Sequence, residues 1–303
     1  MITKKIDQVN LNIFYGYGCN YSCYGCFAGS DHVKKKSLDP NLDEIYQSIP
    51  RLAELFNVTN ELTLIGGEPF MYWNSRIVPL SRELRKHFPG VKIGTITNGQ
   101  LIGKHVDQIL DWFDEMGSAH IVVTKHIDAL LDTRPGKKWL EGADKLFSHP
   151  RLVKIHDEHY HIKDNINANI YLNRPDEWFP SFRYEGNKIK PFATQDPAGS
   201  MRHGCPGRFC SCTFGTKLYK CPKLASLNNH LKVLEQESDS DWKKYLDYPA
   251  LDLLDPTDQD LEFLEQTYGQ PTEHCDMCSN NPKNNVPWYK RDQVMLFGGK
   301  NIP

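Results

Sequence analysis

Three cysteines stand close together near the start of the chain, in the stretch Cys19-Asn20-Tyr21-Ser22-Cys23-Tyr24-Gly25-Cys26-Phe27. They follow an apolar run over residues 11–15, which predicts a strand, and a turn that contains Gly16 and Gly18. Thiolates held this close on one loop can share a metal centre. A four-iron cluster that only transfers electrons takes four protein thiolates, so three thiolates leave one iron open. The stretch therefore predicts an iron–sulfur cluster with a position for a substrate, comparable to the open position of a catalytic zinc.

A second motif, Gly66-Gly67-Glu68-Pro69, follows an apolar run over residues 62–65 that predicts another strand. The C-x3-C-x2-C spacing and this motif together resemble the radical S-adenosylmethionine (SAM) enzymes. The resemblance implies that a 4Fe–4S cluster is bound by Cys19, Cys23 and Cys26, and that its open iron chelates SAM.

The resemblance also assigns contacts to SAM. The glycines of the motif over 66–69 let the backbone approach SAM, and Glu68 accepts a hydrogen bond from the methionine amino group. The family usually carries an aromatic residue just before the third cysteine, where it borders the adenine. That position is Gly25 here, so Tyr24 or Phe27 is expected to supply the ring.

Composition limits the classes of function. The chain has 303 residues, 39% of them hydrophobic, which suffices for one sizeable core and an appended module. The net charge of −2 gives no nucleic-acid footprint. The chain lacks an apolar run long enough for a membrane span and an N-terminal signal peptide, so we expect a cytoplasmic protein. Nine cysteines, an odd number, favour metal ligands over a disulfide framework in that compartment.

Strand and helix patterns alternate through the first two-thirds of the chain. Strands are predicted over 11–15, 61–65, 91–97, 120–124, 152–155 and 166–172, and apolar residues at helical spacing predict helices over 42–55, 77–84, 106–113 and 139–147. The first helix is expected to begin at Asp39-Pro40. Repeated strand–helix units favour a parallel sheet with helices outside it. We therefore predict an α/β fold built as a partial (β/α)6 barrel.

The C-terminal ends of parallel strands meet at one edge of a sheet, where ligands bind. The cysteine loop, the motif over 66–69, Thr97-Asn98-Gly99 and Thr124 all follow predicted strands. The resemblance implies that Asn98 and Thr124 contact SAM. Thr124 stands where members of the family often have a serine that contacts the ribose. Taken alone, Asn98-Gly99 would predict only a turn.

The composition changes from Cys205, beyond a linker over 173–196 that is rich in proline, aromatic and charged residues. The cysteines of this second group are Cys205, Cys210, Cys212, Cys221, Cys275 and Cys278. A Cys-rich hairpin followed by a distant C-x2-C resembles the C-terminal auxiliary-cluster module of radical SAM maturases, called SPASM with two clusters and twitch with one. We therefore divide the chain into a core over 1–195 and an auxiliary module over 196–303.

Six cysteines cannot fully ligate two four-iron clusters, which would need eight thiolates, so one auxiliary cluster is expected. The preferred ligands are Cys212, Cys221, Cys275 and Cys278, with Cys205 or Cys210 as replacements for Cys212. A leftover thiol at Cys205 or Cys210 is then a candidate hydrogen-atom donor, as in some radical SAM epimerases. A structural zinc site is the alternative, since two cysteine pairs can hold tetrahedral zinc.

The resemblance implies reductive cleavage of SAM to a 5′-deoxyadenosyl radical, which abstracts hydrogen from a C–H bond, with a reductant such as flavodoxin or ferredoxin. The auxiliary module favours a peptide or protein side chain as substrate, modified by crosslinking, oxidation or epimerisation. The alternative is a small molecule such as a nucleotide, sugar or cofactor precursor. The first strand begins by Leu11, which leaves no room for the leader-peptide-binding domain common in peptide maturases. A non-catalytic iron–sulfur or zinc protein is the third hypothesis, and Glu68 argues against it because a scaffold has no need of a SAM-contacting carboxylate.

Overall fold

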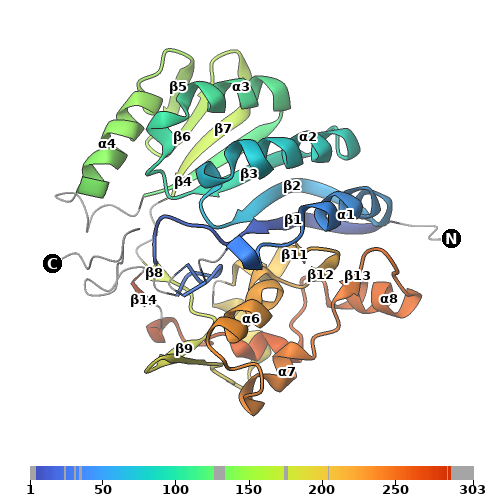
Figure 1. Cartoon of the computed structure of the whole chain (residues 1–303). Helices are drawn as coiled ribbons and strands as arrows, with labels where there is room; N and C mark the ends of the chain where they lie inside the picture. The colour runs from blue at the N-terminus through green and yellow to red at the C-terminus, as the bar shows by residue number, and fades with distance from the viewer. Residues whose placement is uncertain are drawn as a thin grey trace.

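The computed structural model describes residues 5–23, 25–30, 32–33, 36–125, 134–173, 177–203, 205–284 and 286–287. Its main feature is a ten-stranded sheet with the order β13-β12-β11-β1-β2-β3-β4-β7-β6-β5 (Figure 1). The six central strands run parallel to one another. These strands are β11 (Cys210–Phe214), β1 (Ile6–Gly16), β2 (Phe56–Gly66), β3 (Lys92–Thr97), β4 (Ala119–Thr124) and β7 (Asn165–Asn173).

Antiparallel strands extend the sheet at both ends. Beyond β7 lies the hairpin of β6 (His159–Ile162) and β5 (Leu152–His156), and beyond β11 lie β12 (Lys217–Tyr219) and β13 (Leu251–Asp252). Two short pairs stand apart from this sheet: β8 (Glu177–Trp178) with β14 (Val286–Pro287), and β9 (Arg183–Glu185) with β10 (Lys188–Lys190).

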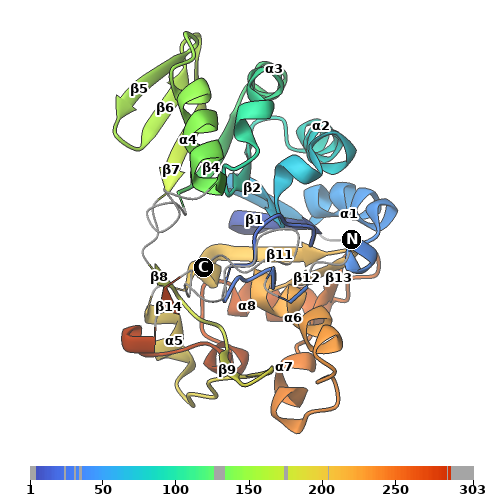
Figure 2. The ribbon, with the colours of Figure 1, turned by 60° about the vertical axis from the view of Figure 1, so that its left-hand side comes forward.

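Four helices cover one face of the parallel strands (Figures 1 and 2). They are α1 (Leu42–Leu55), α2 (Val78–His87), α3 (Val106–Met116) and α4 (Arg134–Phe147). In α1 the buried residues Ile45, Ile49 and Leu52 recur every three or four positions, which puts them on one face. They join buried strand residues such as Leu11 and Leu64 in the main core.

The first helix begins later than predicted. Asn41, not Asp39, is its N-cap, and the Asn41 side chain accepts a hydrogen bond from the Asp43 backbone N–H. The prediction failed because Asp39 has other partners, which are described with the site below.

The segments that follow β10 gather at the end of the sheet formed by β1 and β11 (Figure 2). Their helices are α5 (Pro197–Arg202), α6 (Pro222–Val233), α7 (Lys243–Leu246) and α8 (Asp258–Thr267). Ala225 of α6 packs in a buried cluster with Phe14 and Ile65, whose strand neighbours Ile13 and Leu64 belong to the main core. Side chains alternate between the faces of a strand, so α6 covers the face of the sheet opposite to α1–α4.

The predicted fold class is confirmed: the chain is an α/β protein with a large parallel sheet, as in a partial barrel. The prediction of the fifth strand as a parallel member was wrong, because β5 pairs antiparallel with β6. The sixth parallel strand is β11, which pairs with β1. The sheet thus continues from residues 1–195 into residues 196–303 without a break, and the two-part division stays a prediction. No helix in the described part of the chain is long and apolar enough to cross a membrane.

Candidate active site

The C-terminal ends of β1–β4 meet at one open pocket, as the sequence predicts for parallel strands. The pocket contains about 540 Å³ of empty space, some of it open to solvent. Its walls include these predicted site residues: Cys19, Cys23, Cys26, Phe27, Gly66, Gly67, Glu68, Asn98 and Thr124.

The three thiols of the loop face this pocket. Cys19 and Cys23 are buried and Cys26 is half-buried. The Cys19 sulfur accepts a hydrogen bond from the Tyr21 backbone N–H at 3.4 Å. In the described part of the chain, no three Cys, His, Asp or Glu side chains converge closely enough to enclose a metal ion. The donor set nevertheless fits a cluster with one open iron, because three thiols and a ligand-sized space share one pocket.

One of the predicted contacts to SAM lies elsewhere: Pro69 does not line the pocket and is buried in the first turn of a short 3-10 helix over Pro69–Met71. Tyr24 lies outside the described residues. Phe27 does line the pocket, and so does Tyr21, an aromatic residue of the same loop that was not predicted.

The glycines of the motif allow two loops of the chain to approach each other. The N–H of Gly67 donates to the Gly16 carbonyl, and the N–H of Glu68 donates to the Gly18 carbonyl, both at 2.8 Å. A β-carbon at Gly66 would lie 2.3 Å from the Gly16 oxygen, and one at Gly67 would lie 2.1 Å from the Gly18 oxygen. The motif thus fastens the end of β2 to the start of the cysteine loop.

Glu68 is almost fully buried, with 1% of its surface exposed. Its carboxylate accepts hydrogen bonds from the Thr97 hydroxyl at 2.7 Å, the Asn98 N–H at 2.9 Å and the Phe70 N–H at 3.3 Å. Burial raises the pKa of Glu68 to about 7, although these three hydrogen bonds oppose the rise. The Glu68 side chain therefore joins the ends of β2 and β3 and places a carboxyl group in the pocket wall.

Asn98 connects β3 to the cysteine loop. Its side-chain amide donates to the Asn20 side chain at 2.7 Å and lies 3.9 Å from the Cys19 sulfur. The indole N–H of Trp139 donates to the Asn98 carbonyl at 3.0 Å. Thr124, at the end of β4, is buried and completes the wall.

A network beneath the loop was not predicted from the sequence. Asp39 accepts hydrogen bonds from the Tyr17 N–H at 2.7 Å and from the Tyr72 hydroxyl at 2.8 Å. The Tyr72 oxygen in turn accepts from the Gly18 N–H at 2.7 Å. Arg76 donates to the Tyr15 carbonyl at 2.8 Å. These residues fix the turn that precedes the cysteines, and the only sequence signal, Asp39-Pro40, instead suggested a helix start.

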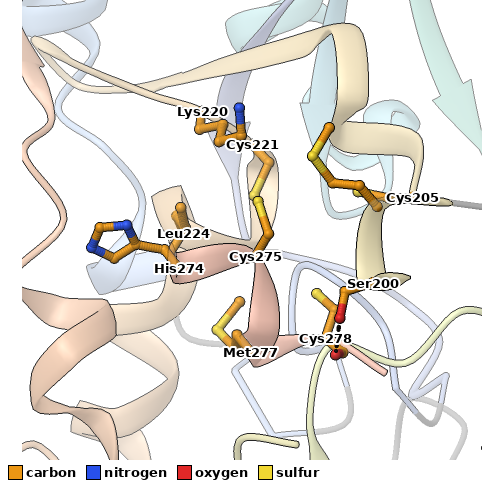
Figure 3. A pocket seen from close by; sticks show the side chains of 10 residues that line it. Ser200, Cys205, Lys220, Cys221, Leu224, His274, Cys275, Met277 and Cys278 are labelled. Atoms are coloured by element: carbon orange, nitrogen blue, oxygen red, sulfur yellow. Dashed lines mark hydrogen bonds between the residues drawn. The ribbon is translucent and has the colours of Figure 1, made fainter. Parts of the chain in front are cut away.

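A second pocket, with about 390 Å³ of empty space, is lined by four thiols. These are Cys205, Cys221, Cys275 and Cys278, the last two from one turn over residues 273–278 (Figure 3). Burial raises the pKa of Cys221 to about 12 and that of Cys278 above its ordinary value, and each thiol is affected by the charge of Cys205.

The structure places Cys205 rather than Cys212 among these thiols. Cys212 is fully buried on β11 and packs in the apolar cluster with Phe14 and Tyr17 instead of lining the pocket. The alternative ligand named from the sequence, Cys205, thus takes the position expected for Cys212.

Cys210 pairs in register with Asn10, six residues before the end of β1 at Gly16. At about 3.3 Å per residue, that is about 20 Å from the strand end where the pocket lies. This position does not support Cys210 as a hydrogen-atom donor, and Cys205 lies with the other three thiols.

Helix α6 connects the two pockets. It follows directly from Cys221, its N-cap. The Ser226 hydroxyl donates to the Phe27 carbonyl at 3.0 Å, and the Asn229 amide donates to the Tyr17 hydroxyl at 3.1 Å. One rigid element therefore holds a thiol of the second pocket and packs against the loop of the first.

Comparisons with known proteins concern the part of the chain that forms the first pocket. Residues 13–140 match the profile of the Radical SAM superfamily. No curated protein matches the sequence. Among solved structures, the chain is similar to BtrN in complex with AdoMet and 2-DOIA, at 13% identity over 91% of this chain and 94% of that chain, with a TM-score of 0.47. It is also similar to native anSMEcpe with bound AdoMet and Cp18Cys peptide, at 20% identity over 46% of this chain and 40% of that chain, with a TM-score of 0.34. The matched residues contain both motifs that form the first pocket, so this part of the chain is similar to the Radical SAM superfamily.

Proposed function

We propose that the chain abstracts a hydrogen atom from a substrate C–H bond with SAM and a 4Fe–4S cluster held by Cys19, Cys23 and Cys26, and that it holds a second 4Fe–4S cluster. The observation that carries the proposal is the pair of thiol-lined pockets joined by α6. A cluster with one open iron supplies an electron to SAM, whose cleavage provides the abstracting radical.

The residues of the first pocket bind and orient SAM. The carboxyl group of Glu68 lies where it can accept a hydrogen bond from an ammonium group, and its own hydrogen bonds hold it in one orientation. Phe27 offers a flat apolar surface for the adenine. Asn98 and Thr124 add polar groups at the ends of β3 and β4.

For the second pocket we propose that Cys205, Cys221, Cys275 and Cys278 ligate an auxiliary cluster in a twitch-like module. Four thiols match the four cysteines of a fully ligated 4Fe–4S cluster. Cys212 is left out because its sulfur lies in an apolar cluster. Zinc is the alternative occupant, since four cysteines also suit tetrahedral zinc.

A peptide or protein side chain is the proposed substrate, and a small molecule is the alternative. The proposed auxiliary cluster favours the first, because such modules are typical of the maturases that the sequence resembles. The solved structures named above include one relative with a bound peptide and one with the compound 2-DOIA.

The first experiment measures 5′-deoxyadenosine from anaerobically reconstituted protein with SAM and dithionite. Wild type should form it, whereas Cys19→Ala, Cys23→Ala and Cys26→Ala should each abolish it. Cys210→Ala is the matched control and should keep the activity, because this thiol is in register with Asn10, six residues before the strand end where the pocket lies. Product formation by any of the first three variants would refute the assignment.

A second experiment separates the substrate classes. Size fractions of a cell extract are added, and the fraction that stimulates 5′-deoxyadenosine formation is treated with protease. Loss of the stimulation would support a peptide or protein substrate. Stimulation by a protease-resistant fraction below about 1 kDa would favour a small molecule instead.

A further inference from the structure

Two lysines lie close to Cys221 in the sequence, one at the second pocket and one beside the wall of the first. Lys220 is buried, lines the pocket with the four thiols (Figure 3), and donates a hydrogen bond to the Thr267 carbonyl at 2.5 Å. Lys223 is half-buried in the first turn of α6. Its ammonium group lies 5.7 Å from the centre of the Phe27 ring, a cation–π distance. Lys223 thus lies two residues after Cys221 of the second pocket and beside Phe27, which lines the first pocket.

The negative charges that act on these two lysines are those of cysteine side chains in their thiolate form. Lys220 interacts electrostatically with Cys275, Cys221 and Cys205. Lys223 interacts with Cys278, Cys221 and Cys205, and also with Cys26 of the first pocket. Burial lowers the pKa of both lysines, and the thiols raise it.

A buried ammonium group is costly unless an opposite charge compensates it. Four neutral thiols would supply no such charge. Four thiolates around a divalent cluster core leave two negative charges, which equals the positive charge of Lys220 and Lys223 together. Each one-electron reduction adds a further negative charge to the cluster, and a nearby positive charge favours that step. Net charge and hydrogen bonds to the sulfurs are among the factors that set the potential of such a centre.

We propose that Lys220 and Lys223 balance the charge of the four-cysteine cluster and raise its reduction potential, and that Lys223 also raises the potential of the Cys19/Cys23/Cys26 cluster. The inference rests on the proposed function, since it requires both clusters. In this proposal the positive charge of Lys223 acts on both clusters, so one side chain couples their two reduction potentials. The electrons come from a low-potential one-electron donor of the flavodoxin or ferredoxin class.

The test is a redox titration of the reconstituted full chain, followed by electron paramagnetic resonance. Lys223→Met should lower the midpoint potential of both clusters. We expect at least a tenfold change in the ratio of oxidised to reduced cluster at a fixed potential, which is 59 mV for a one-electron couple. Lys220→Met should lower the potential of the four-cysteine cluster alone. Lys223→Arg keeps the charge and should restore both potentials.

Lys232→Met is the matched control. It removes a positive charge from an exposed position nine residues further along the same helix, about 13 Å away along its axis, and should leave both potentials unchanged. If Lys223→Met fails to fold, Lys223→Gln removes the charge with a polar side chain of similar shape. Unchanged potentials in the charge-removing variants would overturn the inference, and a shift confined to the four-cysteine cluster would overturn the coupling.

A Cys19/Cys23/Cys26→Ala background separates this inference from the proposed function. About four irons per chain in that background would show that the second cluster exists, so its potential can be measured alone with and without Lys223→Met. Absence of iron there would overturn the second cluster and the inference together. Iron without a change of potential would overturn the inference only.

Discussion

Glu68 should make the stability of the cluster-free protein depend on pH. Its folded pKa of about 7 exceeds the ordinary value of 4.5, because burial disfavours the charged form. Between these values the folded state binds more protons than the unfolded state, so stability falls as pH rises. The gap between 4.5 and about 7, at about 1.36 kcal/mol for each pH unit, corresponds to about 3 kcal/mol. The penalty is absent below pH 4.5 and fully present above pH 7.

The assay is urea unfolding of wild type and Glu68→Gln, anaerobically and without metal, across pH 4.5–8. Glutamine cannot accept at both of its terminal atoms, so the variant loses the hydrogen bond from the Asn98 N–H, at a cost of about 1–3 kcal/mol at every pH. The difference in stability between the two proteins should therefore shift by about 3 kcal/mol in favour of Glu68→Gln from pH 4.5 to pH 8. A difference that does not change with pH would refute the burial argument.

Three further predictions concern the turn before the cysteines, a buried histidine near the start of β4 and the glycine motif. Tyr72→Phe removes the oxygen that accepts a hydrogen bond from the Gly18 N–H, so the free energy of unfolding should fall by about 1–3 kcal/mol in urea titrations. The rate of 5′-deoxyadenosine formation should fall with it. An unchanged rate would show that the turn before the cysteines needs no such support. Burial lowers the pKa of His120 from 6.5 to about 4, so between these pH values the folded state binds fewer protons than the unfolded state. The free energy of unfolding should therefore fall by about 3 kcal/mol as the pH drops from 6.5 to 4. His120→Gln should abolish this loss, and persistence of the loss in the variant would assign it to other groups. Gly66→Ala should destabilise the chain by more than about 2 kcal/mol, because φ is +155° and the new β-carbon would meet the facing carbonyl of β1, whereas Gly90→Ala, with nothing within 4 Å, should change the melting temperature little.

The sequence predicted the first pocket because its information is local. Each motif follows an apolar run, and parallel strands bring their C-terminal ends to one edge whatever the details of packing. The positions of Glu68 and Thr124 in one wall follow from that rule. The resemblance to a known family rested on the same two motifs.

The second pocket depends on contacts between distant parts of the chain. Spacing alone did not distinguish Cys205 from Cys212, because the choice depends on the pairing of β11 with β1, which turns Cys212 into the apolar cluster around Phe14. Asp39 shows the same limit: a proline after an aspartate is typical of a helix start, but the Tyr17 N–H and the Tyr72 hydroxyl bind this carboxylate. Pairing of β11 next to β1 likewise has no signal in either strand by itself.

The central claim, two iron–sulfur centres joined by α6, is tested most directly by iron and sulfide content after anaerobic reconstitution. Wild type should contain about eight irons per chain, and the Cys19/Cys23/Cys26→Ala variant and the Cys205/Cys221/Cys275/Cys278→Ala variant about four each. Cys212→Ala should keep about eight, since its sulfur lies outside the second pocket. About four irons in wild type, falling to none in the first variant and accompanied by zinc, would contradict the account, and so would loss of four irons from Cys212→Ala.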